Sequence, residues 1–184
     1  MLLYYKFNNY CSFSTESEFS MEAPTGKVKS RFPNNYYTSD TGYDVLKTAV
    51  IVGENAGGKS NFINSIKFMK SLFDNNAPVK TIRSYVNSHS FIQNQNPVQN
   101  YEMTIFCQSN TIYTYALSID KDSIISERLF KATKRKGSSI TIFQIDRDEN
   151  GKYAFIKGTA EKEGKVTTQN SNNSYGLFIS KLAL

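Results

Sequence analysis

The chain has 184 residues, of which 39% are hydrophobic and 21% are charged, and its formal net charge is +6. This length is typical of one domain with a modest core, and the composition excludes an acidic disordered chain. No run approaches 18 consecutive apolar residues, and the polar residues near the N-terminus do not fit a signal peptide. Two cysteines, Cys11 and Cys107, are too few for a disulfide framework or a zinc cluster, so we expect a cytoplasmic protein with reduced thiols.

Residues 1–23 are expected to form short strands at Leu2–Asn8, Tyr10–Phe13 and Glu18–Glu22. Asn8 and Asn9 predict a turn between the first two, because asparagine tolerates left-handed backbone angles. From residue 24 to 44 the composition shifts to Gly, Pro, Asn, Ser and Thr, which favours a long surface loop.

Residues 45–73 combine an apolar run, a glycine-rich loop and a helical pattern. Leu46–Val52 ends in four uninterrupted apolar residues, which is typical of a strand buried on both faces of a parallel sheet. After the loop, apolar residues recur at spacings of three and four, which predicts a helix over 61–73. Its apolar face would consist of Phe62, Ile63, Ile66, Met69, Leu72 and Phe73.

The second half of the chain changes to a period of two. Residues 74–100 read as irregular, and residues 101–157 predict an antiparallel β-meander. Its strands are expected at Tyr101–Phe106, Thr111–Ile119, Ile124–Lys131, Ile140–Ile145 and Tyr153–Ile156. After a polar stretch, residues 174–184 are expected to begin a further helix.

The loop between the apolar run and the helix, Gly53–Ser60, matches the phosphate-binding pattern G-x-x-x-x-G-K-S/T in full. Gly53 would let the chain leave the strand sharply, while Gly57 and Gly58 would let backbone N–H groups approach phosphate oxygens. Lys59 would reach the β- and γ-phosphates, and the Ser60 hydroxyl would complete a Mg²⁺ shell. We therefore expect ATP and Mg²⁺ to be held by Gly53, Asn55, Ala56, Gly57, Gly58, Lys59, Ser60 and Asn61.

A phosphate-binding loop alone does not choose among the nucleotide-hydrolysing classes. A small GTPase would carry an N-K-x-D base reader about a hundred residues further on, and the sequence has none. A small-metabolite kinase would need a mostly parallel sheet, whereas the residues after Asn100 predict antiparallel strands. Both classes are disfavoured.

A set of segments spread over nearly the whole chain resembles a known class of ATPase. The segments are NNYCSF at 8–13, FSME at 19–22, VIVGENAGGKSNFINSI at 50–66, YTYALSI at 113–119 and ERL at 127–129. Together they resemble the N-terminal half of ABC/SMC/RecF-like ATPases, in particular prokaryotic AAA-type ATPases of the overcoming-lysogenisation-defect and abortive-infection kind. The loop is the specific part of this resemblance.

The resemblance implies an α/β fold, namely a P-loop NTPase half-domain with a mixed sheet and an antiparallel meander, whose C-terminal half is absent. It implies that ATP binds with its adenine near residues 9–13 and closes two such heads face to face. The second head would come from a homodimer or from a C-terminal ATPase half. The implied setting is phage defence or DNA maintenance with a nuclease or toxin effector.

The resemblance also implies parts that this chain lacks. Hydrolysis in such ATPases needs a Walker B strand ending in Asp-Glu, a signature loop and a switch histidine. The nearest Walker B look-alike, Ile140–Asp146, alternates apolar and polar residues and precedes a hairpin turn, so we interpret it as a hairpin strand. No catalytic residue is identified, and we expect negligible hydrolysis by this chain alone. The alternative function is a non-hydrolysing binding or structural module that needs a partner chain.

Several other residues have an ordinary and a functional interpretation. His89 fits an exposed loop residue better than a catalytic base, and no feature selects a Q-loop glutamine. The basic run at residues 131–136 is the one cluster suited to DNA phosphates, although hairpin tips of this kind are usually only solvated. Both cysteines are expected to be buried as small apolar groups. The Q-loop candidates are Gln93, Gln95, Gln99 and Gln108.

Overall fold

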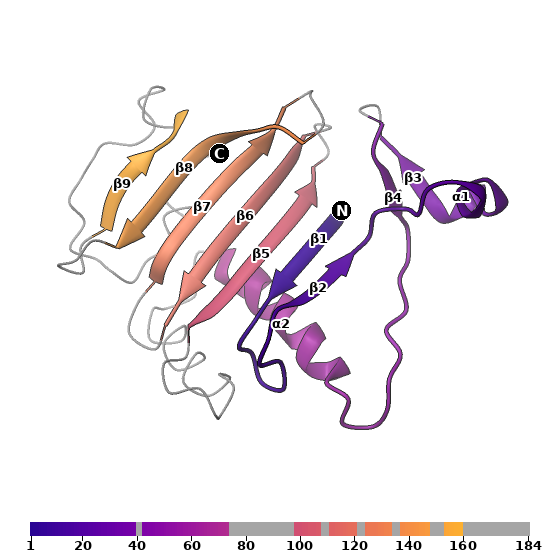
Figure 1. The fold of residues 1–184 in the computed structure, drawn as a ribbon, viewed down its shortest axis with the longest axis horizontal. Coiled ribbons are helices and arrows are strands. Elements are labelled where there is room, and N and C mark those ends of the chain that lie inside the picture. The colour runs from indigo at the N-terminus through magenta and orange to yellow at the C-terminus, as the bar shows by residue number, and fades with distance from the viewer. Residues whose placement is uncertain are drawn as a thin grey trace.

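The computed structural model describes residues 1–39, 42–73, 98–107, 111–120, 124–133, 137–147 and 153–159. Its main feature is a seven-stranded sheet in the order β2-β1-β5-β6-β7-β8-β9 (Figure 1). A separate two-stranded sheet pairs β3 with β4. The fold is therefore α/β with a predominantly antiparallel sheet and few helices among the described residues.

The bounds of the elements follow the chain order. In the large sheet the strands are β1 (Leu2–Phe7), β2 (Ser17–Ser20), β5 (Gln99–Phe106), β6 (Ile112–Ile119), β7 (Ile124–Ala132), β8 (Ser139–Arg147) and β9 (Tyr153–Lys157). The small sheet contains β3 (Tyr36–Thr38) and β4 (Asp44–Leu46). The helices are α1 (Lys27–Arg31), a 3₁₀ turn (Pro33–Asn35) and α2 (Lys59–Phe73).

The predicted meander of five strands is confirmed as β5 to β9. In β6, for example, Tyr115 and Leu117 are buried while the alternating Thr114 and Ala116 are only half-buried. Each neighbouring pair in the large sheet is antiparallel, so the mixed sheet that we expected is wrong for the described strands. For β5 to β9 the physical reason is the short chain between successive strands, which can join antiparallel neighbours but cannot cross over to a parallel one. β1 and β5 are distant in the chain and pair antiparallel without this constraint.

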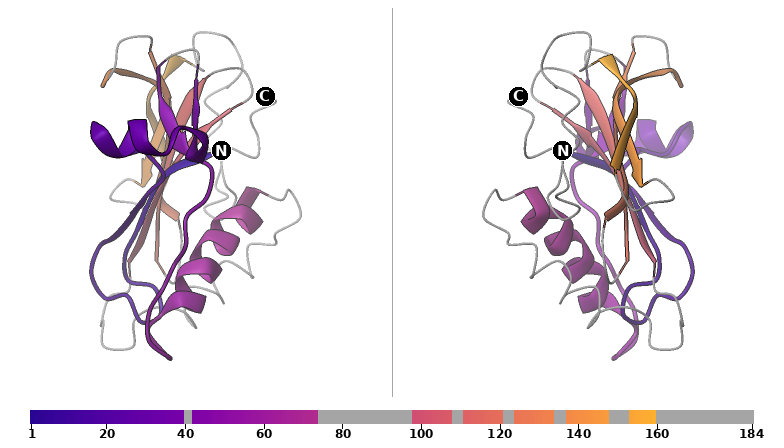
Figure 2. Two further views of the ribbon diagram at one scale, coloured as in Figure 1. Left: turned by 90° about the vertical axis from the view of Figure 1, so that its right-hand side faces the viewer. Right: turned by 90° about the vertical axis from the view of Figure 1, so that its left-hand side faces the viewer.

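The core lies between the large sheet and α2, which covers one face of that sheet (Figure 2). The predicted helix over 61–73 is confirmed, and it begins at Lys59. Its Phe68 ring packs against Tyr101 of β5 at a centroid distance of 5.4 Å. The buried apolar side chains of the helix are Phe62, Phe68, Met69 and Leu72, and they meet Tyr5, Phe7, Tyr101, Tyr115 and Leu117 of the sheet. The place predicted for Ile63 on the apolar face is wrong, because its side chain is 42% exposed.

The segment between β1 and β2 is a tight turn, so the strand predicted at 10–13 is wrong. Tyr10 and Phe13 donate to each other's carbonyls at 2.9 Å, which closes the turn. Asn9 and Cys11 have φ angles of 51° and 50°, which a strand does not allow. The left-handed turn expected at Asn9 is confirmed. The third predicted strand is confirmed as β2, while Glu22 forms only an isolated bridge with Val45.

The predicted loop over 24–44 is wrong in part, because it contains α1, the 3₁₀ turn and β3. Contacts between distant residues order it: Lys29 forms an ion pair with Asp44, and the Tyr36 hydroxyl donates to the Lys29 carbonyl at 2.8 Å. The Ala23 amide also donates to the Asp44 carbonyl at 2.9 Å. Such contacts form only in the folded chain and leave no local signal in composition.

The strand predicted at Leu46–Val52 is also wrong, since only Leu46 belongs to β4. Residues 47–54 have no regular secondary structure and are exposed, with Val50 at 80% and Val52 at 84% exposure. Residues 48–52 make no hydrogen bond with any described residue. A strand requires a neighbouring strand, and the described part of the chain places none beside this segment.

Some expectations fall on other parts of the chain. His89, Gln93, Gln95, Gln108, residues 134–136 and the helix at 174–184 lie outside the described residues. Cys11 and Cys107 are half-buried free thiols, whereas we expected both side chains to be buried. Among the described helices, none has the length and apolar character needed to cross a membrane.

Candidate functional site: the glycine-rich loop and its hairpin

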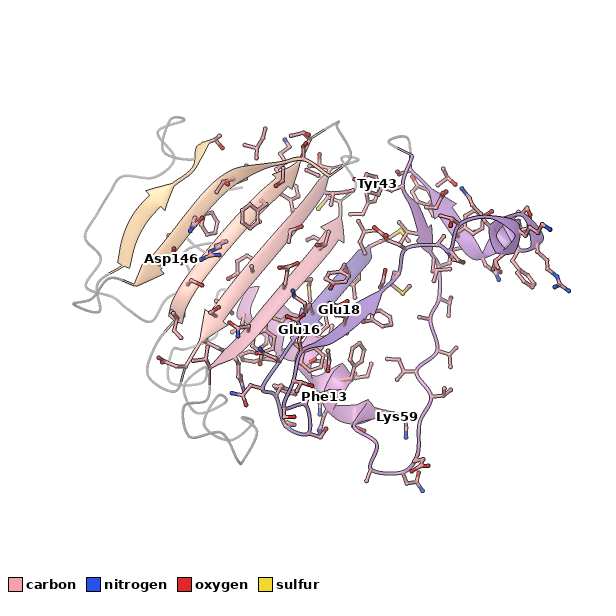
Figure 3. All side chains as sticks on the ribbon, in the orientation of Figure 1. Phe13, Glu16, Glu18, Tyr43, Lys59 and Asp146 are labelled. Carbon is pink, nitrogen blue, oxygen red and sulfur yellow. The ribbon has the colours of Figure 1, made fainter. Side chains whose placement is uncertain are left out.

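The loop Gly53–Ser60 lies between the exposed segment 48–52 and the first turn of α2. Figure 3 places Lys59 at this end of the helix, with Phe13 of the β1–β2 turn nearby. Residues 53–57 are exposed, while Gly58 and Lys59 are half-buried. The loop therefore presents its backbone to solvent at the start of a 15-residue helix, where partial positive charge favours an anion.

Two of the three loop glycines lie close to neighbouring atoms. A Cβ on Gly57 would lie 3.0 Å from the Glu54 carbonyl oxygen, to which the Gly57 amide donates at 3.1 Å. Gly58 has a φ of +84°, and a Cβ there would lie 3.0 Å from the Ser12 Oγ. Gly53 differs: its added Cβ would meet only Lys59 at 3.8 Å. We expected Gly53 to permit a sharp turn. Its φ lies outside the left-handed region, so the backbone at this position does not require glycine.

Lys59 folds back over the loop. Its ammonium Nζ donates to the carbonyl oxygens of Gly53 at 2.8 Å and Glu54 at 2.6 Å. Both acceptors belong to the loop itself, so the charge is held against the loop backbone. A phosphate oxygen entering there would be a stronger acceptor for the same ammonium, because hydrogen bonds between ionised groups are shorter and stronger.

The residues after Lys59 have two different roles. Ser60 is exposed, and its hydroxyl makes no hydrogen bond with the described residues, so it is available to a cation. Asn61 instead donates from Nδ2 to the Ser12 Oγ at 3.1 Å and fastens the β1–β2 turn to the helix. Within the described ranges no group of three His, Cys, Asp or Glu side chains could hold a metal ion. A Mg²⁺ ion here would take Ser60 and the phosphates as ligands.

The β1–β2 turn lies beside the loop, while the expected position of the adenine near residues 9–13 stays a prediction. The Phe13 ring lies 3.2 Å from the position of a Gly58 Cβ and packs edge-on against Phe7 at 4.9 Å. Asn9 is buried and donates to the Val98 carbonyl at 3.0 Å. Ser12 and Phe13 are thus the residues of this turn that face the loop. Sequence reasoning missed the Ser12 contact because nothing local marks it.

Cys11 lies within this turn. Burial raises the pKa of the Cys11 thiol, and a hydrogen bond with Tyr10 acts in the opposite direction. The thiol is therefore kept protonated at neutral pH and is a poor nucleophile.

The hairpin interpretation of Ile140–Asp146 is confirmed, because this segment is β8 and pairs antiparallel with β7 and β9. Asp146 accepts from Arg128 at 3.1 Å and from Gln144 at 2.9 Å. Figure 3 shows Asp146 and Lys59 well apart, on β8 and at the start of α2, so this carboxylate does not reach the loop. The Q-loop candidate Gln99 is fully buried and accepts from the Tyr101 hydroxyl at 2.8 Å.

Comparison with protein-family models, with curated proteins and with solved structures finds no match to this chain.

The two kinds of loop glycine give a matched test. Gly58→Ala is expected to cost about 1–3 kcal/mol of unfolding free energy, because it combines a positive φ with contact against Ser12 and Phe13. Gly53→Ala should change stability by about 0.5 kcal/mol or less, since its Cβ meets only ordinary contacts. Urea unfolding of both variants measures the difference. Equal losses would contradict the loop geometry described here.

Proposed function

We propose that this chain is the ATP-binding lobe of a P-loop NTPase of the ABC/SMC-like class. The observation that carries the proposal is the loop itself. A Cβ on Gly57 or Gly58 would lie only 3.0 Å from its nearest neighbour, and Lys59 holds its ammonium over the loop carbonyls at the first residue of α2. This arrangement suits a chain of phosphates in contact with backbone N–H groups.

In the proposed complex, the β- and γ-phosphates replace the Gly53 and Glu54 carbonyls as acceptors for Lys59. The amides of residues 55–59 and the N-terminus of α2 add donors and a favourable dipole. Ser60 supplies one oxygen to Mg²⁺, which neutralises the phosphate charge. Phe13 and Ser12 border the loop on the side of the β1–β2 turn, where we place the nucleoside.

The exposed segment before the loop supports the proposal that other strands complete this lobe. Val50 and Val52 expose most of their surface, and the backbone of 48–52 has no partner among the described residues. Residues of this type favour a paired and buried strand. We propose that a C-terminal ATPase half or a second copy of the chain supplies the neighbouring strands, and that ATP closes two such heads. Following the resemblance, the setting is cytoplasmic phage defence or DNA maintenance with a nuclease or toxin effector.

The test is a calorimetric titration of the purified chain with ATP and Mg²⁺, with phosphate release followed in the same sample. We expect saturable binding with negligible phosphate release, since no described strand ends beside the loop in a Walker B Asp-Glu pair. Light scattering with and without ATP then measures head pairing. Absence of ATP binding would overturn the proposal, and phosphate release lost in a Lys59→Ala variant would show that the chain is a complete ATPase.

The alternative function is a binding or structural module that uses the same loop without turnover. It is favoured by the position of Asp146, whose carboxylate is engaged by Arg128 and Gln144 far from the loop. The two functions predict different results when a C-terminal ATPase half is added in trans. Restored phosphate release supports the ATPase lobe, whereas binding that remains without release supports the module.

A further inference from the structure

The face of the large sheet turned away from α2 carries a hollow of about 220 Å³. We call it the sheet-face hollow; its floor is formed by Ala116, Ser118 and Ser126, and its walls carry Lys6, Glu102 and Arg128. It is separate from the glycine-rich loop, because Ala116 alternates with Tyr115 and Leu117, which face the α2 side. A ligand could therefore occupy the hollow whether or not the loop binds ATP.

The hollow exists because a small side chain lies between two long ones. The register places Glu102 of β5 opposite Ala116 of β6, and Ala116 opposite Arg128 of β7. One pair along, Ser118 lies opposite both Asn100 and Ser126 and donates to the Asn100 side chain at 2.6 Å. Central strand β6 thus contributes only a methyl and a hydroxyl to a row of charged and polar neighbours.

The charges that line the hollow balance one another. Lys6 and Arg128 are cationic, Glu16 and Glu102 are anionic, and all four line the hollow. Lys6 pairs with Glu16 at 3.3 Å, and this hydrogen bond is the main cause of the raised pKa of Lys6. Because the net charge is zero, the hollow favours neither a phosphate nor a simple cation.

Glu102 and Arg128, on opposite walls of the hollow, both keep hydrogen-bonding groups that are not used. The Glu102 carboxylate can accept, and the Arg128 guanidinium can donate. Glu102 makes no hydrogen bond or close ion pair with the described residues, although it lies opposite Lys6 and its charge helps to raise the pKa of that residue. Arg128 donates from one nitrogen, Nη2, to Asp146 at 3.1 Å, and its buried Nε has no hydrogen-bond partner. A guanidinium carries five N–H donors, so most of them remain for another acceptor. Glu102 and Arg128 do not pair, because β6 lies between their strands.

We propose that the sheet-face hollow binds a small zwitterion of dipeptide size. Its ammonium contacts Glu102, its carboxylate contacts Arg128, and its middle rests on Ala116. Two strand spacings separate the backbones of β5 and β7 by about 9–10 Å, and the side chains shorten the gap. An extended dipeptide separates its charges by about 7 Å, whereas a single amino acid carries both on one carbon. The volume is also below the range of about 300–1,000 Å³ of drug-sized sites.

The experiment is a calorimetric titration with glycylglycine and with two blocked forms, N-acetylglycylglycine and glycylglycine amide. Each blocked form lacks one of the two charges. We expect saturable binding of glycylglycine and at least tenfold weaker binding of both blocked forms. Glu102→Gln should remove the preference for the free ammonium. No saturable binding of glycylglycine, or equal binding of all three probes, would overturn the proposal.

A matched pair of variants separates the hollow from the rest of the sheet. Ala116→Ile fills the hollow with a side chain that strands favour, and it should reduce glycylglycine binding at least tenfold. Thr114→Ile adds the same side chain to the same strand and face, one pair along and outside the lining, and should leave binding unchanged. Both variants should keep the ATP affinity of the unmodified chain. Full glycylglycine binding by Ala116→Ile would contradict the proposed site.

Discussion

Replacing Lys59 with alanine is expected to weaken ATP binding about a hundredfold or more while the fold persists. In the proposed complex the ammonium makes one charge-assisted hydrogen bond to each of two phosphates. Each of these hydrogen bonds contributes about 1.5–3 kcal/mol. Two such bonds correspond to about two powers of ten or more in the dissociation constant. The fold should persist because Nζ contacts only the carbonyls of its own exposed loop.

Lys67→Ala is the matched control for this prediction. Lys67 lies on the exposed side of the same helix and carries the same charge, so its loss tests whether a general positive field explains binding. ATP affinity, measured by calorimetry with Mg²⁺, should change less than threefold or so, since surface charges are largely screened at physiological salt. Equal losses in the two variants would show that the loop does not hold the phosphates.

Phe62→Ala is expected to lower the free energy of unfolding by about 3–5 kcal/mol, which is the cost of removing a packed aromatic ring. The Phe62 ring meets Tyr5, Phe7 and Phe19 at centroid distances of 6.2, 5.9 and 5.2 Å. It therefore joins the first turn of α2 to β1 and β2. Since the same turn carries Lys59, ATP affinity should fall together with stability. Urea unfolding monitored by circular dichroism measures the first effect.

The neighbouring residue provides the control for Phe62. Ile63 is 42% exposed and points away from the sheet, so Ile63→Ala should cost about 1 kcal/mol or less. Comparable losses for the two variants would mean that α2 packs on the sheet through a different face. A larger loss at Ile63 would place a further element of the chain on the outer side of the helix.

Elements with a strong local pattern could be predicted from the sequence. The helix over 61–73 follows from apolar residues at spacings of three and four, and strands β5 to β9 follow from alternation and turn residues. In both cases the pattern that marks the element is also the pattern that buries it against the core. The glycine-rich loop is likewise marked by a local pattern, because its residues are adjacent in the chain, and its phosphate ligand stays a prediction.

Features that depend on distant partners could not be predicted. The run Ala49–Val52 has a strong strand pattern, yet it is exposed because no described strand pairs with it. Conversely, α1 and β3 lie in a segment of loop-like composition that Asp44 and Tyr36 order through contacts with Lys29. The bond between Ser12 and Asn61 joins residues 49 positions apart and has no local signature.

The sheet-face hollow was beyond prediction for a further reason. It depends on the register that aligns Glu102, Ala116 and Arg128 across three strands. A shift of one residue in either pairing would turn one of these side chains to the opposite face and remove the hollow. The alternation of a strand fixes which residues share its face, but not which residue of the next strand lies beside them.

The exposed segment before the loop also bears on how the chain behaves in concentrated solution. Four consecutive apolar residues with high strand propensity are the kind of sequence that recruits identical copies into stacked sheets. Here the segment lies between Lys47 and Glu54, one charge of each sign. Parallel stacking in register would align like charges at both ends and is opposed, whereas antiparallel stacking would pair Lys47 with Glu54. These two residues therefore act as gatekeepers against fibrils of one orientation only.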